Sequence, residues 1–273
     1  MKTMTMTLDF YVVIPCYNDL SGLIESLNSI HYHDEKFAIL IIDDGSDDPV
    51  QRSVLKPFLT KDLQLEIIRI PVNMGITNAL NAGLQWLRDH STQFRYVARL
   101  DCGDLCDVNR FHRQVEYMDH HPDTDLLGSW CVFRNFDNDE SYTYKTPSDI
   151  KRIRRGMYFR NIFIHPTVMW RAESMRDKSY PEKFPHAEDY GLFYELIHQD
   201  LKCVILPEVL MICRLRQQGL SFANRDEQLK SRIKVIRQFG NNRVLKGLGV
   251  LKLGILRLIP YSIVFRIKKI MTG

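Results

Sequence analysis

Three common signatures of α/β enzymes are absent from this 273-residue chain. No GxGxxG turn follows the first predicted strand, which argues against a dinucleotide dehydrogenase. No GxxxxGK[ST] sequence occurs, so phosphate chemistry on a P-loop is not expected. The GxSxG elbow of the α/β-hydrolases is missing as well. These absences leave room for an α/β enzyme whose site is built from other residues.

Paired cysteines and long apolar runs are also missing. The six cysteines form no CxxC pair and no zinc-like spacing, so we expect free thiols in a reducing compartment. The N-terminus has one basic residue and no apolar segment, and we expect no secretory signal. In the basic C-terminal part, the longest uncharged stretch is 258–265, whereas a bilayer-spanning helix takes ~20 residues. We therefore expect a cytoplasmic protein.

Acidic residues are absent after Glu227. Eleven of the 37 basic residues lie in that tail, which leaves 26 basic against 33 acidic residues in the body. The net charge of +4 therefore hides an acidic body and a basic tail. A basic tail favours an anionic partner, either a membrane surface or a nucleic acid.

Nearly continuous apolar runs alternate with helix-forming segments in the first hundred residues. Such runs are typical of buried parallel strands, and they lie at 10–16, 37–43, 65–70 and 94–100. The alternation predicts a Rossmann-like, doubly wound α/β sheet that is mostly parallel. We expect Thr77 to cap the second long helix. The segment 201–216 is predicted to form two short strands around Pro207, in a mixed extension of the sheet.

Polar clusters follow each of the four predicted strands. They read "CYND", "DDGSDD", "NMG" and "DCGD". In doubly wound sheets the ligand binds beyond the carboxyl ends of the strands, so the clusters predict one shared site. An acidic site suits a divalent cation that holds phosphate oxygens.

Six motifs in order resemble family 2 glycosyltransferases of the GT-A fold, between about residues 10 and 222. They are "VVIPCYN", "IIDDGSDD", "NMGITNALNAGL", "YVARLDCGDLCDVNRFHRQVEYMDHHPDTDLLGS", "HPTVMWR" and "HAEDYGLFYEL". The closest likeness is to bacterial enzymes that build lipopolysaccharide, capsule or exopolysaccharide. The resemblance implies an inverting transferase that takes a sugar from a nucleotide-diphosphate donor to a saccharide or lipid-linked acceptor.

The resemblance also implies which residues bind the donor. Pro15 and Tyr17 match the loop against the nucleotide base. Asp44 matches the residue that hydrogen-bonds the base, with Asp43 as its support. Asn73 and Gly75 match a turn that approaches the nucleotide. A solvated turn at the two acids, or a purely structural turn at Asn73–Gly75, is the alternative.

Asp189 matches the general base of these enzymes, and Glu188 would orient it or contact the acceptor. A carboxylate within hydrogen-bond reach can take the proton of an attacking hydroxyl. The alternative is that both acids favour the start of a helix. His165 matches a position near the donor and acceptor sugars, and Arg214 one that can reach the diphosphate; a structural histidine and a surface arginine are the alternatives.

The acidic motif of the resemblance is altered here. Relatives commonly carry Asp-x-Asp-Asp, and in "DCGD" the middle acid is Gly103. We predict that Asp101 and Asp104 hold Mn²⁺ or Mg²⁺, and that Asp101 also contacts the donor. Alternatively, Asp101 only hydrogen-bonds the ribose or the sugar, and Asp104 and Asp107 cap the start of the helix that follows.

The chain is expected to divide into a catalytic domain, 1–225, and a basic amphipathic helical region, 226–273. We expect the second part to dock on the inner face of the cell membrane. The alternative is a helix pair packed on the domain or on a second subunit, and a homo-oligomer is possible. Truncation at about residue 240 would test membrane docking.

Two other functions remain open from the sequence. A sugar-1-phosphate nucleotidyltransferase also binds nucleotides on an α/β sheet, but it usually has a lysine-rich early loop, which "VIPCYNDLSG" lacks. A non-catalytic nucleic-acid module would need a basic, aromatic surface on the body, and the body here is acidic. We therefore expect no nucleic-acid partner.

Overall fold

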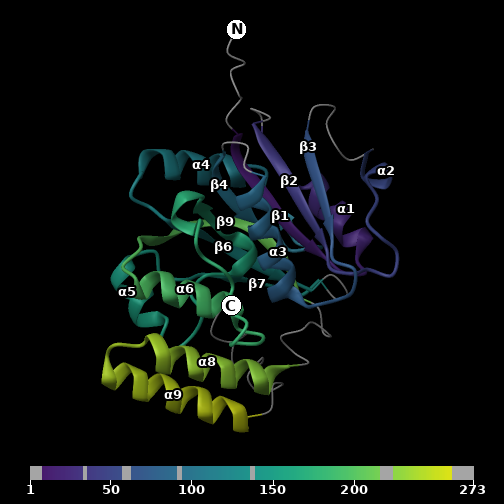
Figure 1. The fold of residues 1–273 in the computed structure, drawn as a ribbon. Coiled ribbons are helices and arrows are strands. Elements are labelled where there is room, and N and C mark those ends of the chain that lie inside the picture. Colours follow the sequence, from purple (N-terminus) through teal and green to yellow (C-terminus); the bar gives the residue numbers. More distant parts are fainter. Residues whose placement is uncertain are drawn as a thin grey trace.

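In the computed structural model, residues 8–32, 36–56, 63–90, 94–135, 139–215 and 224–259 are described. Their strands form one nine-stranded sheet in the order β3-β2-β1-β4-β8-β6-β9-β5, with β7 paired to β6 (Figure 1). The strands are β1 Leu8–Cys16, β2 Phe37–Asp43, β3 Gln64–Arg69, β4 Phe94–Arg99, β5 Leu105–Cys106, β6 Leu126–Arg134, β7 Ser141–Tyr144, β8 Met169–Arg171 and β9 Cys203–Arg214.

Helices cover both faces of this sheet. The α-helices are α1 Leu20–Asn28, α2 Arg52–Leu55, α3 Ile76–Asp89, α4 Arg110–His120, α5 Ile150–Gly156, α6 Glu188–His198, α8 Arg225–Phe239 and α9 Arg243–Leu258. Two short 3-10 helices, η2 His165–Thr167 and η3 Glu173–Met175, flank β8. The predicted α/β fold with a mixed, mostly parallel core is confirmed.

The central strands are buried on both faces, as their continuous apolar runs predict. Every residue of β1 and β2 is buried. Successive side chains of a strand point to opposite faces, so β1 contributes to two cores. Tyr11 and Val13 join one cluster with α3 and α6, while Val12 and Ile14 join the other with α1 and α4. The result is a sheet between two layers of helices.

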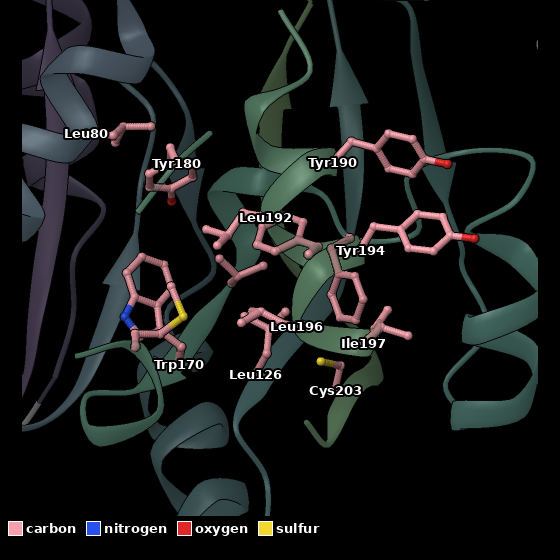
Figure 2. Close-up of a cluster of buried hydrophobic side chains, with 14 of the residues drawn as sticks. Leu80, Leu126, Trp170, Tyr180, Tyr190, Leu192, Tyr194, Leu196, Ile197 and Cys203 are labelled. Atoms are coloured by element: carbon pink, nitrogen blue, oxygen red, sulfur yellow. The ribbon is translucent and has the colours of Figure 1, made fainter. Parts of the chain in front are cut away.

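Aromatic and aliphatic side chains of α6 fix this helix against the sheet. Tyr190 and Tyr194 extend from the same side of α6, and Leu192, Leu196 and Ile197 lie among the buried side chains (Figure 2). The Tyr190 hydroxyl donates a hydrogen bond to the Met157 carbonyl. Tight packing along the helix holds its first residues, Glu188 and Asp189, in a defined position.

Two local predictions are wrong. The segment around Pro207 is one strand, β9, and the register with β6 shifts between Ser129 and Cys131. Pro207 lies at this irregularity, between the paired residues Leu206 and Val209. Its missing N–H therefore removes no hydrogen bond between β6 and β9. Thr77 is not a cap either: α3 begins at Ile76 and its N-cap is Gly75, which the carboxylate of Asp44 contacts through the backbone N–H.

The last two described helices, α8 and α9, lie side by side beneath α5 and α6 (Figure 1). Leu229, Val235, Ile236 and Phe239 of α8 belong to the same buried cluster as α6. Within the described ranges, no helix combines the length and the apolar content needed to cross a bilayer. The division of the chain into two parts near residue 225 stays a prediction. In the structure, α8 packs on the sheet domain and shares a buried cluster with α6.

Candidate active site

The four polar clusters meet at one edge of the sheet. Parallel pairing places Cys16 opposite Asp43, and Asp43 opposite Arg69, so β1, β2 and β3 end together. The parallel pair of β1 and β4 brings the acidic turn after β4 to the same edge. The expectation of a single site beyond the carboxyl ends is therefore consistent with the observed topology.

Asp43 organises the turn after β2. It is fully buried, and its carboxylate accepts hydrogen bonds from the backbone N–H groups of Ser46 (2.9 Å) and Val50 (3.1 Å) and from Arg69 (2.7 Å). Burial raises the pKa of this carboxyl, but the hydrogen bonds from Ser46, Val50 and Arg69 lower it by more, so the pKa lies below its usual value. Asp43 thus supports the turn as an ionised acceptor.

Asp44 joins the second and third clusters. Its two carboxylate oxygens accept hydrogen bonds from the backbone N–H groups of Met74 and Gly75, both at 2.9 Å. Gly75 has a φ of 84°, a conformation that favours glycine. In this structure Asp44 holds the Asn73–Gly75 turn, and its predicted contact with a nucleotide base stays a prediction.

Gly45 is a structural requirement that sequence reasoning did not single out. Its φ is 74°, and a Cβ at this position would lie 2.4 Å from the backbone N of Asn73. The loops after β2 and β3 therefore approach as closely as they do because residue 45 has no side chain. The signal was present in the sequence as a glycine directly after two acids.

Tyr17 is an exposed aromatic residue in the first cluster. Pro15 is buried in β1, whereas Tyr17 just beyond it is 47% exposed. Asn18 fixes this loop, since its side chain exchanges two hydrogen bonds with Asp47, at 2.8 and 3.0 Å. An exposed ring on a braced loop is able to stack on a planar base.

A buried arginine connects the acidic turn to His165. Arg99 is fully buried, forms an ion pair with Asp101, and donates from Nε to His165 Nε2 at 3.3 Å. Because an arginine can only donate, His165 Nε2 accepts, and it also accepts from the Tyr180 hydroxyl at 2.8 Å. Burial and the charge of Arg99 lower the pKa of His165 well below its usual value, so the ring is neutral with its proton on Nδ1.

The backbone conformation of the acidic turn explains why residue 103 is a glycine. Asp104 N–H donates to the Asp101 carbonyl at 3.0 Å, and Gly103 has a φ of 91°. A positive φ at the third position of a turn suits glycine, so an acid there would strain the backbone. Ser26 of α1 holds the turn, as its hydroxyl accepts from Gly103 N–H at 2.9 Å and donates to the Asp104 carbonyl at 2.8 Å.

Asp101 and Asp104 have different surroundings. The Asp101 side chain is 40% exposed and pairs with Arg99 through Oδ1. Asp104 is buried, and its Oδ1 accepts a hydrogen bond from the backbone N–H of Arg214 at 2.8 Å. The Arg214 guanidinium forms an ion pair with Glu25 of α1. Asp101 is therefore the more accessible of the two carboxylates.

Among the described residues, no three or more His, Cys, Asp and Glu side chains are grouped to hold a metal ion. A hard cation that also binds a diphosphate needs only one or two protein carboxylates, because phosphate and water oxygens complete its shell. Asp101 fits that requirement, with Oδ2 lacking a hydrogen-bond partner among the described residues. The donor set is thus compatible with Mn²⁺ or Mg²⁺ held mainly by the ligand.

Two adjacent carboxylates begin α6. Asp189 accepts hydrogen bonds from the Asn161 amide (2.8 Å) and from the Tyr190 backbone N–H (2.6 Å). Burial raises the pKa of Asp189 to about 6, against the opposing effects of the Tyr190 N–H and the positive charge of Arg232. Burial, helped by the charges of Asp189 and Asp101, raises the pKa of Glu188 to about 7.

Glu188 and Asp189 therefore titrate close to neutral pH, which suits a group that exchanges protons with a substrate. Glu188 is 8% exposed, and its buried Oε2 has no hydrogen-bond partner among the described residues. The charge of Asp101 contributes to the raised pKa of both acids, so the predicted metal site lies within electrostatic range of the predicted base.

Arg232 of α8 is a second residue that sequence reasoning missed. Its guanidinium lies 5.3 Å from the centre of the Tyr190 ring, and its charge lowers the pKa of Asp189. A residue of the predicted basic C-terminal region is thus part of the surroundings of the candidate base. Arg232 and Asp189 are 43 positions apart in the chain, and no local pattern connects them.

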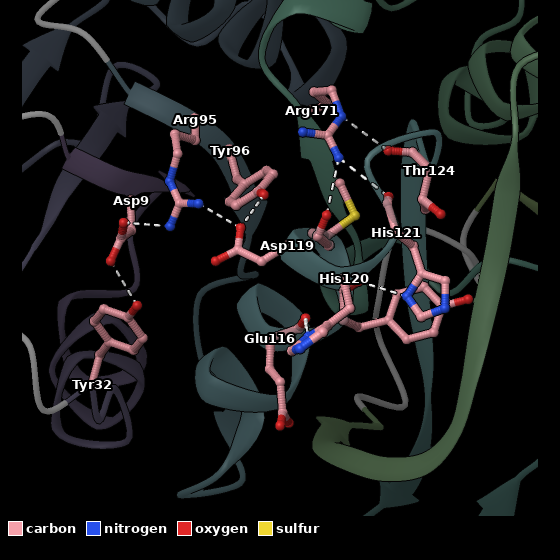
Figure 3. Close-up of polar contacts among 12 residues, drawn as sticks. Asp9, Tyr32, Arg95, Tyr96, Glu116, Asp119, His120, His121, Thr124 and Arg171 are labelled. Carbon is pink, nitrogen blue, oxygen red and sulfur yellow. Dashed lines mark hydrogen bonds and ion pairs between the residues drawn. The ribbon is translucent and has the colours of Figure 1, made fainter.

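The opposite edge of the sheet has a structural polar network. Arg95 pairs with Asp9 and Asp119, and Tyr96 also donates to Asp119 (Figure 3). Arg171 donates to backbone carbonyls, including that of Thr124 (3.2 Å), and stacks over Tyr96. A hollow adjoins this network, and the charged groups of the network bond to one another or to backbone carbonyls. We therefore place the active site at the carboxyl edge.

Comparison with known proteins identifies the family of the chain. The family described as "Glycosyl transferase family 2" matches residues 11–182. An uncharacterized glycosyltransferase of Methanocaldococcus jannaschii, MJ1057, is 27% identical over 226 residues, 82% of this chain and 73% of the relative. The amylovoran biosynthesis glycosyltransferase AmsE of Erwinia amylovora is 28% identical over 236 residues, 84% of each chain. A UDP-Gal:alpha-D-GlcNAc-diphosphoundecaprenol beta-1,3-galactosyltransferase of Escherichia coli is 29% identical over 214 residues, 74% of each chain.

Solved structures share the fold. TarS of S. aureus in complex with UDP-GlcNAc has a TM-score of 0.67 and 17% identity, over 90% of this chain and 71% of that one. The mannosyltransferase PcManGT of Pyrobaculum calidifontis in complex with GDP-Man and Mn²⁺ has a TM-score of 0.63 and 19% identity, over 85% of this chain and 64% of that one. The arrangement of the sheet and its helices is thus that of GT-A proteins.

Proposed function

Because the chain belongs to glycosyl transferase family 2, and is therefore a glycosyltransferase, we propose that its donor is a nucleoside-diphosphate sugar. Two structural neighbours, TarS and PcManGT, bind donors of this class. The proposed acceptor is a saccharide or a lipid-linked sugar. AmsE, named for amylovoran biosynthesis, and the E. coli enzyme, named for a diphosphoundecaprenol acceptor, support a role in building a cell-surface polysaccharide.

One observation carries the proposal: Glu188 and Asp189 begin α6 as two adjacent, largely enclosed carboxyl groups, and the Asn161 amide orients Asp189. Their raised pKa values, to which the charge of the accessible Asp101 contributes, agree with this arrangement. A sugar hydroxyl is a weak nucleophile near neutral pH, and a positioned carboxylate of this basicity can accept its proton. The two acids and Asp101 would therefore serve the acceptor side and the donor side of one reaction.

In the proposed reaction Asp189 is the general base. Its carboxylate accepts the proton of the acceptor hydroxyl while the hydroxyl oxygen bonds to the anomeric carbon. The bond from that carbon to the diphosphate oxygen breaks, its electron pair leaves with the nucleoside diphosphate, and the anomeric configuration inverts. Asn161 orients Asp189 through its 2.8 Å hydrogen bond, and Glu188 contributes a second carboxylate to the acceptor side.

On the donor side, we assign the nucleotide to the loops after β1, β2 and β3. Tyr17 would stack on the base, and the turn held by Asp44 would approach the nucleoside through the backbone of Asn73 and Gly75. Pro15 and Asp43 support these loops from inside. We assign His165 to the region of the donor sugar, because Arg99 links it to Asp101. We assign Arg214 to the region of the diphosphate, because its backbone N–H bonds to Asp104 in the acidic turn.

We assign a divalent cation, Mn²⁺ or Mg²⁺, to Asp101, with Asp104 as the second candidate. When bound, such a cation supplies positive charge to the departing diphosphate. The Mn²⁺ in PcManGT supports this assignment. We place the enzyme in the cytoplasm, at the inner face of the cell membrane, where a lipid-linked acceptor would be found.

The test is a panel of nucleotide sugars (UDP-, GDP- and dTDP-linked) offered to the purified full chain with and without Mn²⁺, with binding measured by calorimetry and release of nucleoside diphosphate measured with time. We expect one donor to bind and to be turned over. Asp189→Asn should lower turnover by about 10²–10⁴-fold, because the base is removed, while donor affinity changes little.

Glu195→Gln is the matched control, since Glu195 is a partly exposed carboxylate on the same helix. Full activity of Asp189→Asn would remove Asp189 as the base. Release of pyrophosphate from a nucleoside triphosphate and a sugar phosphate, with no turnover of any nucleotide sugar, would favour a nucleotidyltransferase instead.

A further inference from the structure

Helix α9 exposes a continuous apolar stripe. Its members are between 49% and 85% exposed and follow one another at spacings of 4, 3, 4 and 3 residues: Val244, Leu248, Leu251, Ile255 and Leu258. This spacing keeps all five on one side of an α-helix. We call these residues the α9 outer stripe. Isolated exposed apolar residues are ordinary, but five in one row mark an interaction surface.

The opposite side of α9 is already occupied. Gly249 and Leu253 are buried, and a Cβ on Gly249 would lie 2.1 Å from the Tyr158 carbonyl oxygen, so the helix packs closely on the domain. Arg257 pairs with Asp226 of α8 at 2.6 Å, which fixes the far end of the helix. The rotation of α9 is therefore set by packing, and the outer stripe faces away from the protein.

Basic residues surround the α9 outer stripe. Residues 228–259 contain eight Lys and Arg and no Asp or Glu. Exposed cations lie on both sides of the stripe, at Arg243 and Lys252, and along α8 at Lys234 and Arg237. Lys230 of α8 is also exposed, but it pairs with Asp226. In sequence, residues 260–273 continue with three more basic residues, several apolar ones and no acid. An apolar row within a positive field matches an anionic lipid surface.

We propose that the α9 outer stripe is the face by which the protein docks on an anionic membrane. The helix would lie in the plane of the lipid headgroups, with its apolar row inserted and the flanking Lys and Arg at the phosphates. This deepens the proposed function by naming the face that meets the membrane, and it rests on that function only for the choice of a lipid-linked acceptor.

Two other occupants fit the same face less well. A second copy of the chain would bring two strongly basic helices together, which costs electrostatic free energy. A nucleic acid would suit the charge, but it would leave the five aliphatic side chains without an apolar partner, and α9 carries no aromatic residue for stacking. Both occupants are outcomes of the test.

The experiment uses the full chain and two vesicle preparations, one of phosphatidylcholine and one of phosphatidylcholine with phosphatidylglycerol. Flotation measures the bound fraction. We expect binding to the anionic vesicles that weakens with added salt. Leu248→Glu with Leu251→Glu should lower the partition coefficient by about tenfold or more, because each substitution removes an inserting side chain and adds a repelled charge.

Two further variants separate the causes. Leu248→Asn with Leu251→Asn removes apolar surface without adding charge, and it should weaken binding by a smaller factor. Val54→Glu is the control, because Val54 on α2 is 41% exposed and lies far from α9 (Figure 1). It adds the same kind of charge and should leave vesicle binding unchanged. Urea unfolding of each variant checks that the fold is intact.

Equal flotation of the stripe variants and the unmodified chain would overturn the proposal, as would failure of the unmodified chain to bind anionic vesicles. The unmodified chain could instead fail to bind vesicles but self-associate in light scattering, or bind duplex DNA. If the stripe variants abolished that interaction, the face would be assigned to a second copy or to a nucleic acid. Donor hydrolysis should be the same in the stripe variants. If neither the unmodified chain nor any variant hydrolysed a donor, while flotation with vesicles was retained, the result would count against the proposed function and not against membrane docking.

Discussion

At the scale of single residues, the candidate site contains a buried acid, Glu188, whose ionisation lowers the stability of the fold. Glu188 is buried with a pKa raised to about 7, so its ionised form destabilises the folded state. The folded protein holds this proton more tightly than the unfolded chain does. The free energy of unfolding contributed by Glu188 therefore falls as pH rises from about 4.5 to about 7.

Glu188→Gln should remove that dependence. We expect the variant to be more stable than the unmodified protein by about 1–3 kcal/mol at pH 8, and nearly equal to it at pH 4, where both side chains are neutral. Urea denaturation at several pH values measures the difference. Glu195→Gln serves as control, and a Glu188→Gln difference that does not vary with pH would show that the buried charge is not its cause.

Three residues of the candidate site could be placed at one edge of the sheet from the sequence alone. Tyr17, Asp44 and Asp101 come immediately after apolar runs, and parallel strands bring such positions to one edge. Their partners could not be predicted. That Asp44 accepts from two backbone N–H groups, or that His165 lies against a buried arginine, depends on contacts between segments distant in the chain.

At the scale of elements, α8 is expected to take part in the proposed chemistry through one residue, Arg232. Arg232 lowers the pKa of Asp189, so its removal should raise that pKa from about 6. A base is active only when deprotonated. Arg232→Gln should therefore move the acidic limb of the pH–rate profile of kcat/KM to higher pH, with a loss of about 2–10-fold near pH 6 and a smaller loss near pH 8.

The matched control for Arg232→Gln is Arg237→Gln, because Arg237 lies exposed on the same helix. It should leave the midpoint of the acidic limb in place. A loss of activity that is equal at all pH values in Arg232→Gln would indicate a structural role for Arg232 and would remove its electrostatic one. Donor affinity, measured alongside, separates either effect from damage to the nucleotide loops.

Element types were predictable where apolar periodicity was strong, as in β1, β2 and α3. Boundaries and continuity were less predictable. Pro207 suggested a break, and the chain instead runs through it as a single strand at a register shift with β6. The start of α3 depends on the backbone of Gly75 and on Asp44, which is distant in sequence, so a search for a local capping residue chose Thr77 wrongly.

At the scale of the whole molecule, the C-terminal helices are part of the folded unit. Leu253 is buried, and Leu245, Val250 and Leu256 pack against the same cluster. A chain ending at residue 240 should lose several kcal/mol of unfolding free energy, at about 1.5–3 kcal/mol for a fully buried aliphatic side chain. The urea midpoint measures this loss.

A chain ending at residue 259 is the control for this truncation, because it keeps all of α9. Equal stability of the two truncated chains would show that α9 contributes nothing to the core. The expected instability of the shorter chain also explains why truncation is a poor test of membrane docking: release from a membrane could follow from unfolding. Substitutions in the α9 outer stripe avoid that ambiguity.

The position of Arg232 has a consequence for the design of chimeras. One helix pair lowers the pKa of Asp189, the proposed base, through α8, and forms the outward apolar face through α9. Exchanging this pair with that of a relative would change both properties at once. A chimera joined near residue 225 should therefore need compensating changes around Asp189 before it recovers full turnover.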